Sequence, residues 1–182
     1  MNTKLWLTPA QAQALVAAAQ RAAPREACGV IGGKGSVVQR VLALDNVAAN
    51  PQTHYVLDGA DFVRAWAALE KEGLDLLGIY HSHPKGEALP SSKDIQDAAY
   101  PDAVYVIIGL AGAKAQLAGW RIVYGQVTAV ELCMGTPTGI DENVTLSRAQ
   151  RFAIILSAVL ALLFLLLLAL SLLPPAPVIP VR

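Results

Sequence analysis

Two histidines and an aspartate are spaced along the chain in a way that suits a metal ion. His81 and His83 are separated by one residue, and residues i and i+2 of an extended strand point to the same side. Asp94 follows eleven residues after His83, behind a loop containing Gly and Pro that lets the chain turn back. Two neutral imidazoles and one carboxylate form a three-ligand zinc set that leaves the fourth tetrahedral position for water. The spacing therefore predicts a catalytic zinc site with His81, His83 and Asp94 as ligands.

Each part of this pattern also has a simpler interpretation. A lone His-x-His on a protein surface usually binds nothing. The run from Ser91 to Asp94 resembles a helix capping box, with Asp in place of the usual Glu. The two interpretations of that run are compatible, because a capped helix would hold Asp94 rigidly near a metal.

The segments around these residues predict a sheet with helices. Residues 74–80 are apolar apart from Asp75, which predicts a central strand that ends at His81. Thr8 and Asp58 are typical helix N-caps, and they predict helices from Thr8 to about Ala23 and from Asp58 to Gly73. The other expected elements are strands at 27–31, 37–44, 55–57, 105–110, 115–123 and 126–132, with a helix at 91–99. The order mixes hairpins with helices, so we expect an α+β fold with a mixed β-sheet flanked by helices.

Composition excludes several functional classes. The 182 residues carry 14 basic and 14 acidic side chains, so no strong field points to nucleic acid as a partner. The two cysteines are too few to form a disulfide framework, and a reducing compartment is the simpler expectation, although one disulfide stays possible. Hydrophobic residues make up 54% of the chain, which is high for a soluble domain. Most of the excess lies between residues 152 and 173.

Residues 152–173 are 22 in number, and only Ser157 and Ser171 among them are polar. A helix of this length rises about 33 Å, enough to cross a hydrocarbon core of about 30 Å. The alternative is a buried core helix, but a domain of this size could hardly cover every face of so apolar a segment. Arg148 and Arg151 precede the segment and only Arg182 follows it, a weak bias that favours a cytosolic N-terminal domain.

The expected organisation is thus a catalytic domain at 1–134, a linker at 135–151, a single transmembrane helix at 152–173 and a short tail at 174–182. The apolar run at 5–7 is too short for a signal peptide. We therefore expect a tail anchor in the cytoplasmic membrane, with the catalytic domain facing the cytosol.

The motif resembles that of a known enzyme family. His81-Ser82-His83-Pro84, Ser91 eight residues after His83, and Asp94 three further on are similar to the signature of JAMM (MPN+) zinc metalloproteases. Glu26, after the first expected helix, resembles the family's upstream glutamate, as in its compact prokaryotic members. The resemblance implies that Glu26 is the general base and then acid, that Ser91 stabilises the oxyanion, and that the fold is cytidine-deaminase-like.

The resemblance also implies a substrate class. Family members are peptidases or isopeptidases that act next to the C-terminal Gly-Gly of ubiquitin-like or sulfur-carrier proteins. A processing enzyme for a thiocarboxylate carrier shares this chemistry. The alternative from another class is a catalytically silent MPN-type scaffold that recruits partners to the membrane. Silent relatives typically lack one or more metal ligands, whereas all three ligands, the glutamate and the serine are present here.

Overall fold

The computed structural model describes residues 3–136, residue 157 and residues 160–164. The chain divides into two compact units, Met1–Thr138 and Gly139–Arg182, and the sheet and its helices belong to the first. The strands are β1 (Lys4–Leu7), β2 (Cys28–Lys34), β3 (Val37–Leu44), β4 (Asp75–His83), β5 (Val104–Gly109), β6 (Gln116–Val123) and β7 (Gln126–Met134). The helices are α1 (Pro9–Ala22), α2 (Gly59–Lys71) and α3 (Ser92–Asp97).

The strands form one mixed sheet that closes on itself in the order β1-β3-β2-β4-β5-β6-β7. Three pairings are parallel: β4 with β5, β1 with β7, and β1 with β3. The other pairs, β2–β3, β2–β4, β5–β6 and β6–β7, are antiparallel. Closure depends on β1, which pairs along its whole length with β7 but meets β3 at one register position, Trp6 opposite Val37.

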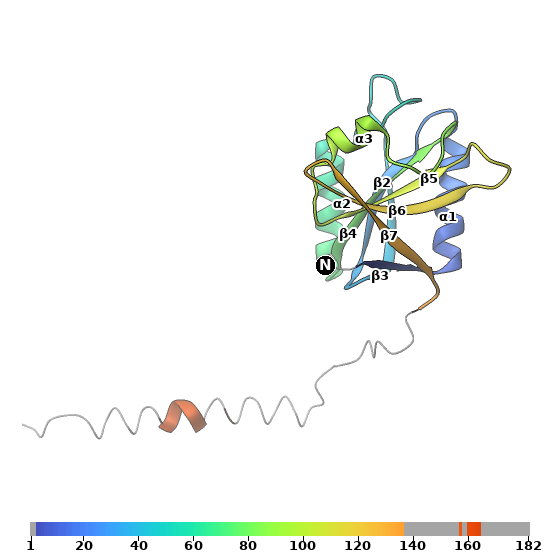
Figure 1. The fold of residues 1–182 in the computed structure, drawn as a ribbon. Helices are drawn as coiled ribbons and strands as arrows, with labels where there is room; N and C mark the ends of the chain where they lie inside the picture. The colour runs from blue at the N-terminus through green and yellow to red at the C-terminus, as the bar shows by residue number, and fades with distance from the viewer. Residues whose placement is uncertain (1–2, 137–156, 158–159, 165–182) are drawn as a thin grey trace, which may run out of the picture. The chain divides into compact units, whose positions relative to one another are not determined.

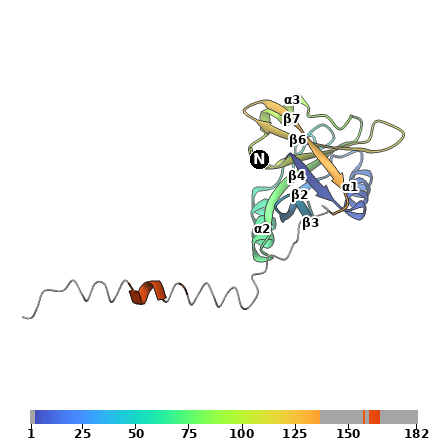
Figure 2. The same cartoon turned by 60° about the horizontal axis from the view of Figure 1, so that its bottom comes forward.

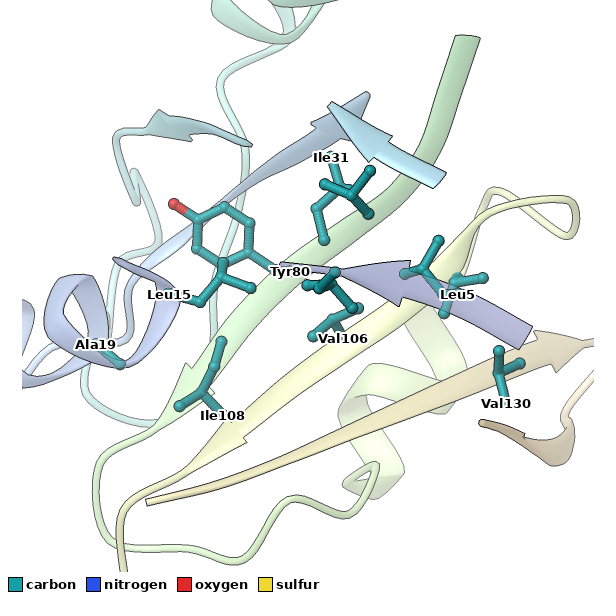
Figure 3. Packing of buried hydrophobic residues seen from close by; sticks show 11 residues of the cluster. Leu5, Leu15, Ala19, Ile31, Tyr80, Val106, Ile108 and Val130 are labelled. Atoms are coloured by element: carbon teal, nitrogen blue, oxygen red, sulfur yellow. The ribbon is translucent and has the colours of Figure 1, made fainter. Parts of the chain in front are cut away.

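Two hydrophobic clusters lie on the two faces of the sheet, each with its own helix. Leu15 and Ala19 of α1 pack in the first cluster, against Tyr80 and Val106 of the central strands (Figure 3). Phe62 and Leu69 of α2 pack in the second. The two helices therefore lie on opposite sides of the sheet, as both views of the ribbon show (Figures 1 and 2).

Both long helices begin where the sequence predicts. The Thr8 side chain accepts from the Gln11 amide and Gln11 returns a bond to the Thr8 backbone, with Pro9 at the first helical position. Asp58 accepts from the amides of Ala60 and Asp61 at the start of α2. These local bonds satisfy amides that no helical carbonyl can reach, which fixes the first turn of each helix.

The expected mixed sheet with flanking helices is confirmed, and two details differ. Leu5 and Leu7 lie in strand β1, which the sequence did not predict. The strand expected at Tyr55–Leu57 is wrong: its only ladder contact is an isolated bridge between Asn46 and Leu57. The amide of Val56 is bonded instead to the side chain of Asn46, so this segment stays a loop.

Among the residues described, no helix combines the length and the apolar character needed to span a bilayer. Ser157 and residues 160–164 are helical. The rest of the membrane segment expected at 152–173 lies outside the described residues, as do the tail at 174–182 and the linker from residue 137 onward.

Candidate metal centre

Strand β4 delivers both histidines to the α2 side of the sheet. Ile79 packs in the cluster beneath α2, and His81 and His83 follow it at two-residue steps on the same face. The Nε2 atoms of the two histidines are 3.0 Å apart. The ring of Tyr55 stacks on His81, with centroids 4.4 Å apart and planes inclined by 19°. The side chain of His81 has no exposed surface.

Helix α3 brings the carboxylate. Asp94 stands at the third position of α3, where its amide donates to Ser91 Oγ at 3.2 Å and its Oδ2 accepts from the Ser91 amide at 2.7 Å. The same carboxylate places Oδ1 3.3 Å from His81 Nε2 and Oδ2 3.3 Å from His83 Nε2. The capping box and the approach to the histidines therefore coexist, as the sequence predicts.

Burial and mutual hydrogen bonds shift the pKa values of all three side chains. Burial lowers the pKa of His81, which favours the neutral imidazole. Burial is the largest single influence on His83 and acts in the same sense. Hydrogen bonds to Asp94 and to the Glu87 carbonyl, together with the charges of Asp94 and Glu26, outweigh it and raise the pKa of that imidazole. Burial alone would raise the pKa of Asp94; hydrogen bonds from both histidines reverse this and hold it far below its usual range. The site therefore presents a fixed anion facing two nitrogen ligands.

Backbone contacts around His83 orient its ring. His83 Nδ1 lies 2.9 Å from the carbonyl oxygen of Glu87, so Nδ1 carries the proton and Nε2 is left as the ligand atom. The loop that supplies this carbonyl packs directly on Gly109 of β5. A Cβ at Gly109 would lie 2.5 Å from the Ala88 nitrogen and 2.6 Å from the Glu87 carbonyl carbon. Only glycine allows the loop to approach β5 so closely.

The donor set fits zinc. Ligand atoms from His81, His83 and Asp94 all lie within 4.8 Å of one another, and the closest pairs are separated by 3.0–3.3 Å. Ligands placed tetrahedrally about 2.0–2.1 Å from one zinc ion are about 3.3–3.4 Å apart. Two imidazoles and a carboxylate also match the ligand types of catalytic zinc sites, so the residues present suit this metal.

Glu26 lies buried beside the ligands, with only 4% of its surface exposed. Its Oε2 has no hydrogen-bond partner among the residues that the structure describes. Burial, together with the nearby carboxylate of Asp94 and against the opposing effect of His83, raises the pKa of Glu26 to about 7. A carboxyl group with such a pKa can both accept and release a proton near neutral pH.

Ser82, between the two ligands, ties Glu26 to β4. Its Oγ accepts from the amide of Ala27 at 2.8 Å, and its own amide donates to the Ala27 carbonyl at 2.9 Å. The register of β2 with β4 places Cys28 opposite His81. The bonds between Ser82 and Ala27 extend this pairing by one residue, to the residue that follows Glu26.

Ser91 keeps a free donor. As the N-cap of α3 its oxygen accepts from the Asp94 amide, which occupies a lone pair but not the hydroxyl hydrogen. The hydroxyl can therefore still donate to a group bound beside Asp94.

Cys28 is not one of the clustered ligands in the described part of the chain. Its thiol is buried and donates to the Leu44 carbonyl at 3.6 Å. Burial raises the pKa of Cys28 to about 12, and the carboxylates of Glu26 and Asp45 act in the same direction. Cys28 is therefore a buried core thiol that stays protonated near neutral pH. Both Cys28 and Cys133 are free cysteines.

Three contributors to the site escaped the sequence interpretation: Asn46, Tyr55 and Ser82. The sequence leaves Asn46 between the strands expected at 37–44 and 55–57, predicts a strand at Tyr55, and gives Ser82 no role beyond its place in the motif. Their partners lie far along the chain, up to 55 residues away for Ser82 and Ala27. Burial of a polar Asn beside apolar neighbours cannot be inferred from its local sequence.

A family model for prokaryotic homologs of the JAB domain matches residues 8–123. A curated protein of Thermus thermophilus, named a probable TtuB-protein conjugate cleaving protease, is 48% identical over 97 residues, which is 53% of this chain and 64% of that protein. A CysO-cysteine peptidase of Mycobacterium tuberculosis is 40% identical over 118 residues, covering 63% of this chain and 80% of the peptidase.

A solved structure with the same fold is that of a protein from Desulfitobacterium hafniense. It aligns with a TM-score of 0.67 at 33% identity and covers 73% of this chain and 94% of its own. The region matched by the family model, residues 8–123, contains β2 to β6. It therefore includes Glu26, both histidines, Ser91 and Asp94.

Proposed function

The chain belongs to the prokaryotic JAB family. We propose that it is a zinc-dependent metallopeptidase that cleaves a peptide or isopeptide bond after a C-terminal Gly-Gly. The observation that carries this proposal is the meeting of His81, His83 and Asp94 beside a buried Glu26. The proposed substrate is a ubiquitin-like or sulfur-carrier protein.

His81, His83 and Asp94 would hold the zinc, which when bound supplies a Lewis acid and lowers the pKa of a water. Glu26 accepts the proton of the attacking water and returns it to the leaving amine. Its pKa of about 7 suits both transfers, because neither protonation state is strongly preferred near neutral pH. Burial of Glu26 keeps bulk water from competing for the same proton.

Ser91 donates its hydroxyl hydrogen to the carbonyl oxygen as that oxygen becomes an anion. The capping bond with Asp94 fixes the rotamer of Ser91, so the donor is oriented before the substrate arrives. A positioned donor of this kind contributes about 2.7–4 kcal/mol to transition-state stabilisation.

The relatives support a protein tail as substrate. The Thermus protein is named for cleaving a protein conjugate, and the Mycobacterium peptidase for a CysO-cysteine bond. The chain spans 64% of the Thermus protein's length. The loop from His83 to Ser91 is short, and a tail of two glycines can pass such a site without a side chain in the way.

A pair of matched variants tests the reaction. Glu26→Gln should retain one zinc per protein and lose hydrolysis of a Gly-Gly-extended carrier fusion by at least about 100-fold, because a proton acceptor is removed while the ligands stay. Glu70→Gln, an exposed position on α2, should cleave like the wild type. Full activity in Glu26→Gln means that another group moves the proton. A wild type that leaves Gly-Gly fusions intact at full zinc loading refutes the substrate.

We also propose that residues 152–173 tether the protein to the cytoplasmic membrane with the catalytic domain in the cytosol. The support is in the sequence: the segment has no charge, is long enough to cross the hydrocarbon core, and is preceded by Arg148 and Arg151. A tether of this kind restricts the enzyme to substrates that reach the membrane surface.

Fractionation tests the tether. The full chain should sediment with membranes through high salt and carbonate, whereas a chain ending at residue 143 should stay in the supernatant. In sealed right-side-out vesicles, added protease should spare the domain. Release of the full chain by salt alone, or digestion of the domain from outside, would contradict the proposal.

A further inference from the structure

The loop between β3 and α2, residues 45–58, packs against the metal centre on the α2 side of the sheet. Its anchor is Asn46, a polar residue with only 8% of its surface exposed. A buried amide of this kind must have its hydrogen-bonding groups satisfied, and each partner then becomes fixed relative to the others.

Asn46 is fully engaged. Its Nδ2 donates to the carbonyls of Glu26 at 3.1 Å and His54 at 3.1 Å, and lies 3.4 Å from the carbonyl of Pro51. Its Oδ1 accepts from the amides of Ala48 at 3.0 Å and Val56 at 3.1 Å. Three carbonyls face one end of the side chain and two amides face the other, which sets the orientation of the amide group.

The first connection runs to the base. The loop bonds both backbone groups of Glu26: Asn46 Nδ2 donates to the carbonyl, and the amide donates to the Pro51 carbonyl at 2.7 Å. The preceding residue, Arg25, also donates from its guanidinium to the Asn46 carbonyl at 3.0 Å. The backbone of Glu26 is thus held from the loop side by Asn46 and its neighbours.

The second connection runs to a metal ligand. Asn46 bonds the carbonyl of His54 and the amide of Val56, the residues on either side of Tyr55. Tyr55 is the residue whose ring stacks on His81. The Nδ1 of His81 has no hydrogen-bond partner within the described residues, unlike that of His83, so the stacked ring of Tyr55 takes a larger part in orienting this imidazole.

We propose that Asn46 is a positioning residue that fixes Glu26 and the imidazole of His81 relative to each other through one side chain. The inference rests on the proposed function, because it assigns Glu26 the proton transfer. One amide holds the backbone of the base and, through Tyr55, the plane of a ligand ring. Loss of the amide's donors frees both groups, while the ligands themselves stay in place on β4 and α3.

A positioning role for Asn46 and a role in loop stability alone have different effects on the enzyme. A loop that only contributes to folding would lower the melting temperature when weakened, and the surviving folded enzyme would turn over normally. A positioning residue instead lowers kcat in the folded, zinc-loaded enzyme, because small misplacements of a reacting group cost about 10- to 100-fold in rate. KM should change little, since Asn46 is buried and does not meet the substrate.

Asn46→Asp is the first test, because it keeps the shape and the acceptor of the side chain and removes the donors. Its matched control is Asn50→Asp, the same change at an exposed position of the same loop. The probe is a fluorogenic amide of a peptide ending in Gly-Gly, assayed with full-length protein at one zinc per chain. We expect kcat of Asn46→Asp to fall about 10- to 100-fold with KM within about three-fold, and Asn50→Asp to match the wild type.

A spectroscopic readout follows the ligand ring without hydrolysis. The visible absorption of the Co²⁺-substituted protein should change in Asn46→Asp and in Tyr55→Leu, which removes the stacked ring. The spectrum of Tyr55→Phe, which keeps the ring, should match that of the wild type. Should Asn46→Asp fail to fold, Tyr55→Leu decides the question: unchanged kcat and an unchanged Co²⁺ spectrum in that variant overturn the proposal.

The outcomes separate this inference from the proposed function. A wild type with an intact Co²⁺ spectrum that cleaves neither the peptide probe nor a Gly-Gly-extended carrier fusion refutes the proposed function. A wild type that cleaves it, together with Asn46→Asp that has wild-type kcat and spectrum, overturns the positioning role alone. Loss of bound metal in Asn46→Asp also overturns it, because Asn46 would then hold the ligand set together rather than align it.

Discussion

Gly109 sets how closely the His83–Ser91 loop packs on β5, and Gly109→Ala should therefore weaken zinc binding. Gly109 is not in the left-handed region, so alanine can adopt its backbone conformation and the effect is purely one of space. The added methyl would lie 2.5 Å from the Ala88 nitrogen, where ordinary van der Waals contact begins at 3.4 Å. The loop must retreat by about 0.9 Å, because the obstacle is backbone rather than a flexible side chain.

That displacement is large enough to break the bond that orients His83. The Glu87 carbonyl lies 2.9 Å from His83 Nδ1, and a retreat of about 0.9 Å takes it beyond hydrogen-bonding distance. Loss of such a partner to a metal-ligating histidine typically costs 10- to 100-fold in metal affinity, so we expect the zinc Kd to rise by about that factor. The overpacked contact should also lower the free energy of unfolding by about 1–3 kcal/mol.

Gly112→Ala is the matched control. A Cβ there would find its nearest neighbour, the Lys114 carbonyl oxygen, at 3.5 Å, an ordinary contact. Both substitutions reduce the entropy of the unfolded chain equally, so the difference between them isolates the clash. Competition with a chromophoric chelator gives the zinc Kd, and urea unfolding of the metal-free proteins gives the stability. Equal zinc affinities in the two variants would refute the role assigned to the Glu87 carbonyl.

Three further predictions follow from the ligands, the buried thiol and the α2 cap. Asp94→Asn should abolish stoichiometric zinc and the rise in melting temperature that zinc gives the wild type, because a neutral amide replaces the anionic ligand; retained zinc by metal analysis would exclude Asp94 as a ligand. The pKa of Cys28 is raised to about 12, so the unfolded chain releases this proton first as pH rises above about 9 and stability falls across that window. Between pH 8 and 10.5 the free energy of unfolding should fall by about 2 kcal/mol more in the wild type than in Cys28→Ala. An equal fall in both proteins, measured by denaturant unfolding at each pH, would contradict this prediction. Asp58→Ala should cost about 1 kcal/mol of stability with unchanged zinc affinity, since it removes the two hydrogen bonds that the Asp58 side chain accepts from backbone amides at the start of α2. A loss of zinc would show that the cap also supports the site.

The parts of the molecule that sequence could predict are those fixed by local spacing. The two-residue step from His81 to His83 and the capping box from Ser91 to Asp94 each follow from the geometry of one element, and both are confirmed. The caps at Thr8 and Asp58 are local in the same sense.

The parts that escaped prediction depend on pairing between distant segments. Strand β1 is four residues long and forms because β7 lies beside it, more than 120 residues later in the chain. The burial of Asn46 depends on carbonyls from Glu26 and His54, which local composition does not bring together. Such contacts are decided by the tertiary fold and leave no periodic signal in the sequence.

The closure of the sheet by β1 and β7 has a consequence for the order of folding during synthesis. The segments that supply the zinc ligands, β4 and α3, emerge from the ribosome well before β7. The last seam, between Lys4–Leu7 and Glu131–Met134, joins segments from opposite ends of the domain and is the pairing of longest range. Until β7 is in place, β6 and β1 each have an edge without a partner strand, and an exposed edge can recruit another chain. Truncation at residue 123, where the family match ends, removes β7 and leaves both edges unpaired in the finished chain. Such a shortened protein should aggregate even though every residue of its metal centre is present.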